Sequence, residues 1–131
     1  MKTEIIHEAC RQSITNNLPF PEVVKRLTQA DVESYYADLG QLQKTYYGSD
    51  GEICVSRMVM EPLGPIGDQF DAKLIQEAIQ AIMQRKITYV EFLRRIVGAG
   101  TFAYTVHIRG RKAIYLGRAG DFHVEHFPSG K

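Results

Sequence analysis

The stretch Tyr46-Tyr47-Gly48-Ser49-Asp50-Gly51-Glu52 recurs 69 positions later as Tyr115-Leu116-Gly117-Arg118-Ala119-Gly120-Asp121. Both glycines of the first stretch are present in the second. Glycine adopts the positive φ angles of tight hairpins without steric cost. We therefore interpret the two stretches as turns with the same backbone path, each joining two strands.

The comparison extends outward from the turn over most of the chain. At the same offset, residues 5–58 align with residues 74–127 without a gap, and identical residues are spread along the whole alignment: Ile6/Ile75, Glu8/Glu77, Ala9/Ala78, Glu22/Glu91, Arg26/Arg95, Ala30/Ala99, Tyr35/Tyr104, Tyr46/Tyr115, Gly48/Gly117, Gly51/Gly120 and Val55/Val124. An ungapped register of this length predicts a tandem duplication. The copies cover about residues 3–60 and 71–128, and the residues between them, 61–70, form a Pro/Gly-rich connector. Half of the chain is too small to bury its own apolar face well, so we predict a single domain over residues 1–131.

Each copy predicts two helices followed by three strands. Apolar residues recur at helical spacing in the first part of each copy, and Thr88 with Glu91 has the spacing of a capping box. Alternating patterns then predict strands at about residues 33–39, 43–47 and 52–59, and at 101–109, 112–116 and 121–127. No parallel βαβ rhythm is present. The predicted fold is α+β, with antiparallel strands in one or two sheets, four packing helices and a pseudo-two-fold axis.

The strand patterns also bear on side-chain orientation and on hairpin register. In the third strands we expect Ile53, Val55, Phe122 and Val124 to point inward. In the hairpin of the second copy, a two-residue loop would pair Tyr104 with Tyr115, and a three-residue loop would pair Tyr104 with Leu116. The six tyrosines of these strands are expected to pack in the core and across strands.

Composition excludes few classes of protein. Apolar residues make up 44% of the chain and charged residues 24%, as in folded globular proteins. The net charge is +1, divided between about −3 in residues 1–65 and +4 in residues 66–131. No apolar run approaches the roughly 18 residues of a membrane span, and the N-terminal residues lack the pattern of a signal peptide. We expect a cytoplasmic protein with free thiols at Cys10 and Cys54.

Three residues of the second copy are candidates for catalysis. His123 and Glu125 alternate on one face of the last strand, and His107 lies on the polar face of the first strand. If those strands were close, the three side chains would form a general acid/base pair or a metal site. The first copy has Asp38, Cys54 and Ser56 at the matching positions, so the histidines are specific to the second copy. The alternative is that all three face solvent.

Basic residues suggest a second candidate site. Arg109, Arg111, Lys112 and Arg118 lie on two turns of the second copy and are candidates for binding a phosphate or carboxylate, with Tyr104 beside them. Solvated turns are the alternative interpretation, and nucleic acid is disfavoured because most of the strand aromatics point inward. Cys54 has no activating base near it in the sequence. No phosphate loop, serine elbow or metal-binding motif is present, and we predict no metal or cofactor.

The chain resembles the YbcV-like family, small proteins of enterobacteria and their prophages that carry a domain-of-unknown-function label. The resemblance rests on Phe20-Pro21-Glu22-Val23-Val24, Val32-Glu33-Ser34-Tyr35, residues 46–52 and residues 110–121. It implies no activity and no functional residues.

We favour a non-catalytic binding or interaction module, with a groove between the copies as the expected site. Its partner would be a protein, a small anionic ligand or a second copy of the chain. A small enzyme that uses His107, His123 and Glu125, or an anion-binding protein that uses the basic residues, is the alternative. A phage structural component is a third interpretation, from the family label alone.

Overall fold

The computed structural model describes residues 1–128 and repeats one order of elements twice. The first copy contains helices α1 (Thr3–Thr15) and α2 (Phe20–Gln29) and strands β1 (Val32–Asp38), β2 (Gln43–Gly48) and β3 (Ile53–Arg57). The second copy contains helices α3 (Ala72–Met83) and α4 (Tyr89–Gly98) and strands β4 (Thr101–His107), β5 (Lys112–Gly117) and β6 (Phe122–His126). The α+β class and the helix-helix-three-strand unit are confirmed.

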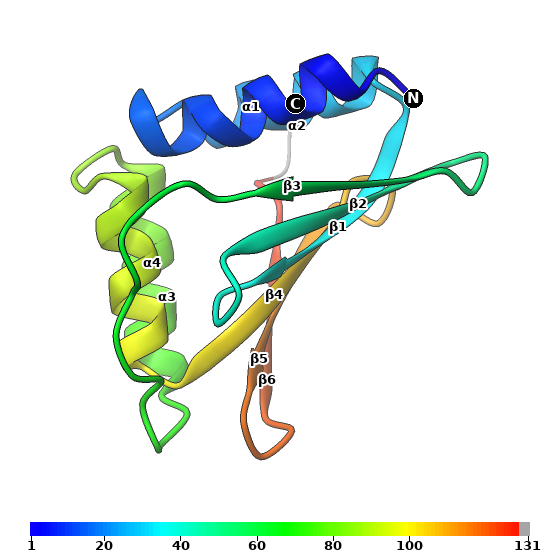
Figure 1. The fold of residues 1–131 in the computed structure, drawn as a ribbon. Helices are drawn as coiled ribbons and strands as arrows, with labels where there is room; N and C mark the ends of the chain where they lie inside the picture. Colours follow the sequence, from blue (N-terminus) through cyan, green and yellow to red (C-terminus); the bar gives the residue numbers. More distant parts are fainter. Residues whose placement is uncertain (129–131) are drawn as a thin grey trace.

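All six strands form one antiparallel sheet in the order β3-β2-β1-β4-β5-β6. The copies therefore meet at β1 and β4 in the centre. Tyr36 pairs there with Thr105, which is the same position in the other copy, so a pseudo-two-fold axis passes between them. The helix pairs α1–α2 and α3–α4 lie on the same face of the sheet, at a steep angle to each other (Figure 1).

The helices bury equivalent apolar stripes against this face. Ile6, Ala9 and Cys10 of α1 are almost fully buried, as are the equivalent Ile75, Ala78 and Ile79 of α3. Burial of such stripes provides most of the stability of short helices in proteins. No helix within residues 1–128 has the length and apolarity needed to cross a membrane.

Side-chain caps fix where the helices of the second copy begin. Asp71 Oδ1 accepts a hydrogen bond from Leu74 N at 3.1 Å, and Thr88 Oγ1 accepts one from Glu91 N at 3.1 Å. The first half of the predicted capping box is therefore present. Glu91 does not complete the box, because its carboxylate pairs with Arg95 at 3.0 Å.

The repeated glycine turns follow the same path, as predicted. Gly51 has a φ of 92° and Gly120 a φ of 91°. In each turn the N–H of the first glycine donates to the carbonyl four residues later, Gly48 to Glu52 and Gly117 to Asp121, both at 2.8 Å. The register of the other hairpin pairs Tyr104 with Tyr115, which settles the alternative left open by the sequence.

The predicted orientation of the third strands is wrong. Ile53, Val55 and Phe122 are 62%, 51% and 65% exposed, and Val124 is half-buried, all on the sheet face that carries no helices. Cys54 is buried on the helix side. This orientation has a physical reason. Helix α1 lies over β3, and the small side chains on the helix-facing side of this strand allow the helix to approach it closely.

Candidate functional site

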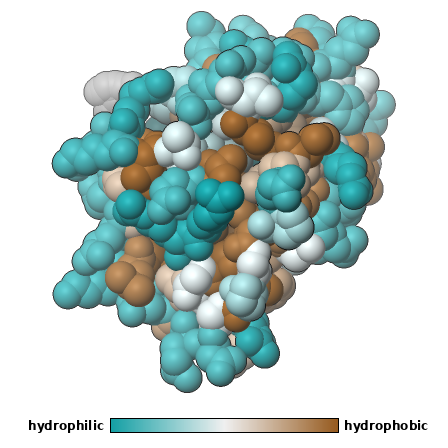
Figure 2. Space-filling view, turned by 60° about the vertical axis from the view of Figure 1, so that its left-hand side comes forward, coloured by the Kyte–Doolittle hydropathy of each residue, from teal (hydrophilic) through white to brown (hydrophobic). Residues whose placement is uncertain are grey.

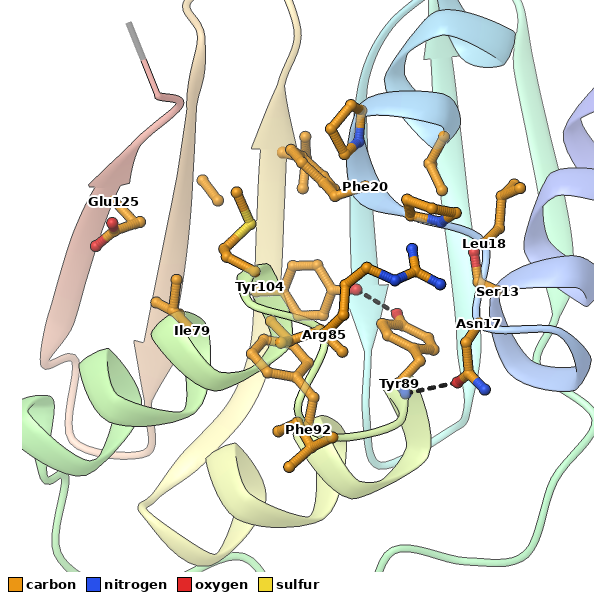
Figure 3. Close-up of a pocket in the computed structure, with 18 of the residues that line it drawn as sticks. Ser13, Asn17, Leu18, Phe20, Ile79, Arg85, Tyr89, Phe92, Tyr104 and Glu125 are labelled. Carbon is orange, nitrogen blue, oxygen red and sulfur yellow. Dashed lines mark hydrogen bonds between the residues drawn. The ribbon is translucent and has the colours of Figure 1, made fainter.

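A cavity of about 960 Å³ lies between the two helix pairs and the centre of the sheet. The loops that join the helices in each copy, residues 16–19 and 84–88, meet at its side, and Asn17 Oδ1 accepts a hydrogen bond from Tyr89 N at 2.9 Å (Figure 3). Residues of both copies line it. The expected groove between the copies is therefore present, on the face that carries the helices.

Tyrosine rings form much of the cavity floor. Tyr35, Tyr104 and Tyr115 come from three strands, and the rings of Tyr104 and Tyr115 stack with their centroids 5.4 Å apart. Tyr89 reaches across from α4, and its hydroxyl lies 2.5 Å from that of Tyr104 (Figure 3). The core packing expected for the strand tyrosines holds for Tyr35, Tyr104 and Tyr115, which are buried and also line the cavity. It does not hold for Tyr47, which is 39% exposed.

Lys44 is the only lysine or arginine on this floor among the described residues, and it is 3% exposed. Its Nζ lies 4.8 Å from the centre of the Tyr89 ring and 5.4 Å from that of Tyr35. Ammonium groups are attracted to aromatic faces at such distances. No carboxylate within residues 1–128 forms an ion pair with Lys44. A buried cation is thus held by aromatic rings without a negative partner.

The protonation of the floor follows from its surroundings. Burial by itself lowers the pKa of Lys44, but the phenol oxygens of Tyr104 and Tyr35 oppose it and leave the pKa raised. Burial also raises the pKa values of Tyr35, Tyr89, Tyr104 and Tyr115. At neutral pH the floor therefore presents an ammonium and uncharged phenols, all of them hydrogen-bond donors.

The walls are mostly apolar. They include these aliphatic and aromatic side chains from both copies: Leu18, Phe20, Val23, Ile79, Ile82, Met83, Ile87, Phe92, Val106 and Phe127. Arg85, from the loop after α3, lies across the opening (Figure 3). Figure 2 shows the side of the molecule where the helix pairs approach each other, with apolar groups along its middle and hydrophilic groups around them. An apolar pocket with few polar groups is typical of small-molecule sites.

One of the predicted catalytic residues, Glu125, lies at the far end of the same cavity, and a second, His123, contacts it. Glu125 Oε1 lies 3.2 Å from His123 Nε2. His123 and Glu125 are half-buried, whereas the equivalent Cys54 and Ser56 are buried. The helix-facing side of the sheet is therefore more exposed at β6 than at β3.

His107 does not join them. It follows the inward-facing Val106 and so points to the opposite face of the sheet, where it pairs with Lys112 of β5. Strand β5 also separates β4 from β6. His107 Nε2 instead lies 2.9 Å from Thr105 Oγ1. The predicted convergence of His107, His123 and Glu125 is thus not found.

The predicted basic cluster is also divided. Arg109, Arg111 and Lys112 lie at the β4–β5 turn, and Arg118 lies at the other end of β5, where it pairs with Asp68 at 3.1 Å. Arg109 pairs with Glu33 at 3.2 Å. Arg109 and Lys112, with His107, line a second hollow of about 500 Å³ on the helix-free face. Arg111 donates to the carbonyl of Pro128 at 3.3 Å.

Cys54 has a neighbour that the sequence did not indicate. Its Sγ lies 3.7 Å from Nε2 of His7 in α1, and His7 Nδ1 lies 2.8 Å from Ser56 Oγ. Cys54 is buried, and burial raises the pKa of its thiol. The imidazole of His7 therefore lies beside the Cys54 side chain, for which the neutral thiol is favoured over the thiolate. No group of three His, Cys, Asp or Glu side chains within residues 1–128 is arranged to hold a metal ion.

Lys44 is the residue that the sequence interpretation missed. A usable signal exists, because Lys44 is two positions before the inward-facing Tyr46 on the same strand and must share its face. The equivalent residue in the second copy is Ala113, as expected of an inward position. A lysine at such a position indicates a buried charge.

Comparison with known proteins gives a family but no activity. No curated protein matches the chain. The family model described as "Protein of unknown function (DUF1398)" matches residues 7–125, which is most of the chain and includes parts of both copies. The chain therefore belongs to this family of proteins of unknown function.

Proposed function

We propose that this protein binds a small amphipathic molecule whose anionic group, such as a carboxylate, meets Lys44 at the cavity floor. The observation that carries the proposal is that Lys44, which is 3% exposed and lines the cavity, has no carboxylate partner among the described residues. The rings and phenol oxygens around Lys44 keep its ammonium charged but supply no carboxylate. A ligand anion would form an ion pair with this ammonium and accept hydrogen bonds from the phenols beside it.

The apolar walls indicate the rest of the ligand. Removing apolar surface from water stabilises a complex by about 25 cal/mol per Å². The side chains around Lys44 are aromatic and aliphatic, so they favour a hydrocarbon or aromatic body over a sugar or nucleotide. A carboxylate of medium chain length combines the two features.

Binding accounts for the floor better than catalysis does. The raised pKa values of Lys44 and of the tyrosines leave no general base or amine nucleophile there at neutral pH. The enzyme alternative requires His107 beside His123 and Glu125, and these lie on opposite faces of the sheet.

Calorimetric titration with decanoate and with uncharged 1-decanol tests the proposal. We expect the protein to bind decanoate at least tenfold more tightly, since hydrogen bonds to charged groups contribute about 1.5–3 kcal/mol. Lys44→Met removes the charge and should reduce the ratio of the decanoate affinity to the 1-decanol affinity to near one. Lys112→Met is the matched control, because Lys112 lies on the other face of the same sheet.

Two outcomes would reject the proposal. One is the absence of binding of either compound to the folded protein. The other is decanoate binding that survives Lys44→Met but is lost in Lys112→Met, which would place the anion at the hollow beside Arg109 and Lys112 instead.

We further propose that the protein acts in the cytoplasm and, within its family, belongs with the YbcV-like proteins of enterobacteria and their prophages. The support is the set of sequence motifs around Tyr35, Gly48 and Gly117 and the two unpaired thiols. Neither point changes the ligand expected from the cavity.

A further inference from the structure

We infer that the ligand is amphoteric: its anionic end lies at Lys44 and a cationic group at its other end, such as an ammonium, is bound by Glu125. The inference rests on the proposed function, because it concerns the other end of the same cavity. It names the class of ligand as an elongated molecule with opposite charges at its two ends and an apolar body between them.

The two copies carry different charges on the helix-facing side of the sheet. The duplication places tyrosines at equivalent positions, Tyr35 with Tyr104 and Tyr46 with Tyr115. The charges on the same face break this symmetry. Lys44 corresponds to Ala113, and Glu125 corresponds to Ser56. The helix-facing side of the sheet therefore has a cation in one copy and an anion in the other.

The two oxygens of the Glu125 carboxylate differ in their hydrogen bonding. Its Oε1 is oriented by His123 Nε2 at 3.2 Å, and its Oε2 has no hydrogen-bond partner within residues 1–128. Glu125 pairs across the strands with Ala113, whose small side chain leaves the space between Glu125 and the centre of the floor open. The carboxylate is thus positioned by one oxygen and available through the other.

The other carboxylate of the cavity wall provides a contrast. Glu91 also lines the cavity, but Arg95 neutralises it at 3.0 Å from the next turn of the same helix. Glu125 has no lysine or arginine partner among the described residues. A cationic group in the cavity would therefore be attracted to Glu125 rather than to Glu91.

The separation of the two charges sets the length of the ligand. Lys44 lies on β2 and Glu125 on β6, four strands apart. Neighbouring strands are about 4.8 Å apart, so the two backbone positions are separated by roughly 19 Å across the sheet. The side chains of Lys44 and Glu125 shorten this span. Short molecules such as single α-amino acids would not reach both groups.

Calorimetry with ω-amino carboxylates of eight to fourteen carbons tests the inference, each compared with the unsubstituted carboxylate of the same length. For at least one length we expect the amino acid to bind the wild-type protein tenfold or more tightly than the plain acid. In Glu125→Gln the order should reverse, because an ammonium then loses its water without gaining a partner. Glu91→Gln, the matched control, should keep the wild-type preference. Thermal unfolding of each variant checks that it is folded.

Other results would overturn the inference. If plain carboxylates bind through Lys44 and the ω-amino compounds bind no better at any length, the amphoteric ligand is wrong and the proposed function stands. If the amino compounds are preferred equally by the wild-type protein and Glu125→Gln, Glu125 is not the group that binds the cation. If neither series binds, both the inference and the proposed function fail.

Discussion

Lys44 of β2 and Ala113 of β5 occupy the same position in the two copies, and both residues line the cavity. A strictly symmetric floor would have either two buried cations or none. The chain instead has one ammonium surrounded by tyrosine rings, without a carboxylate partner among residues 1–128. This asymmetry is the reason to assign a ligand to the cavity rather than to treat it as a packing defect.

Lys44→Met should leave the free energy of unfolding unchanged within about 1 kcal/mol, or increase it. The variant loses interactions with the rings of Tyr35 and Tyr89, each about 0.5–2 kcal/mol, but it also removes the desolvation cost of the ammonium, which those rings and the phenol oxygens offset. Urea denaturation measures the difference. A loss of more than about 2 kcal/mol would mean that Lys44 serves mainly to stabilise the fold.

Decanoate affinity should be constant from pH 7 to about pH 9.5. The pKa of Lys44 is raised above the ordinary lysine value of about 10.4, so its ammonium stays charged over this range. Any favourable contribution of that charge is present at lower pH and is lost as the pH rises through the raised pKa. Calorimetry at several pH values checks this. A fall in affinity with a midpoint between pH 7 and pH 9 would show that the amine titrates there.

The protein should lose stability steeply above pH 10. Burial raises the pKa values of Tyr35, Tyr46, Tyr89, Tyr104 and Tyr115, so they remain neutral in the folded protein after unfolded tyrosines, with a pKa of about 10, have ionised. The unfolded state then binds fewer protons, and stability falls by up to about 1.4 kcal/mol per pH unit for each such tyrosine. Urea denaturation at pH 9 and pH 11 measures the change.

Tyr115→Phe is the control for this alkaline effect, because it removes one ionisable group and keeps the ring. It should reduce the pH dependence by the share of one tyrosine. An equally steep loss of stability in the variant would mean that other groups cause it.

Cys54 should react slowly with iodoacetamide at neutral pH, at least tenfold more slowly than in the urea-unfolded chain. It is 6% exposed, and burial, together with Cys10, raises the pKa of its thiol. The thiolate is the reactive form. Peptide mass spectrometry follows the labelling. Fast labelling that disappears in His7→Ala would instead show that the imidazole of His7 activates the thiol.

The sequence predicted the elements well because the duplication allowed each copy to check the other. The paired glycines of residues 48–51 and 117–120 and the alternation around Tyr46 and Tyr115 determine the strands and their turns. The face of the third strands could not be predicted in this way. Ile53 and Val55 are apolar but lie on the sheet face that carries no helices, and Cys54 and Ser56 lie beneath α1 because they are small.

The site was less predictable than the fold. His107 and His123 lie on opposite faces because of the registers of β4 and β6 with β5, and β5 also separates the two strands. The cavity depends on the angle between the two helix pairs, which no local pattern encodes (Figure 1). Lys44 alone could have been identified, from its spacing to Tyr46 and its replacement by Ala113.

A crystal structure of the protein with 10-bromodecanoate tests the central claim most directly, because the anomalous signal of bromine locates one end of the ligand. We expect the carboxylate within hydrogen-bond distance of Lys44 Nζ and the bromine among the apolar walls towards β6. A carboxylate bound on the helix-free face, beside Arg109 and Lys112, with the cavity empty, would contradict the account.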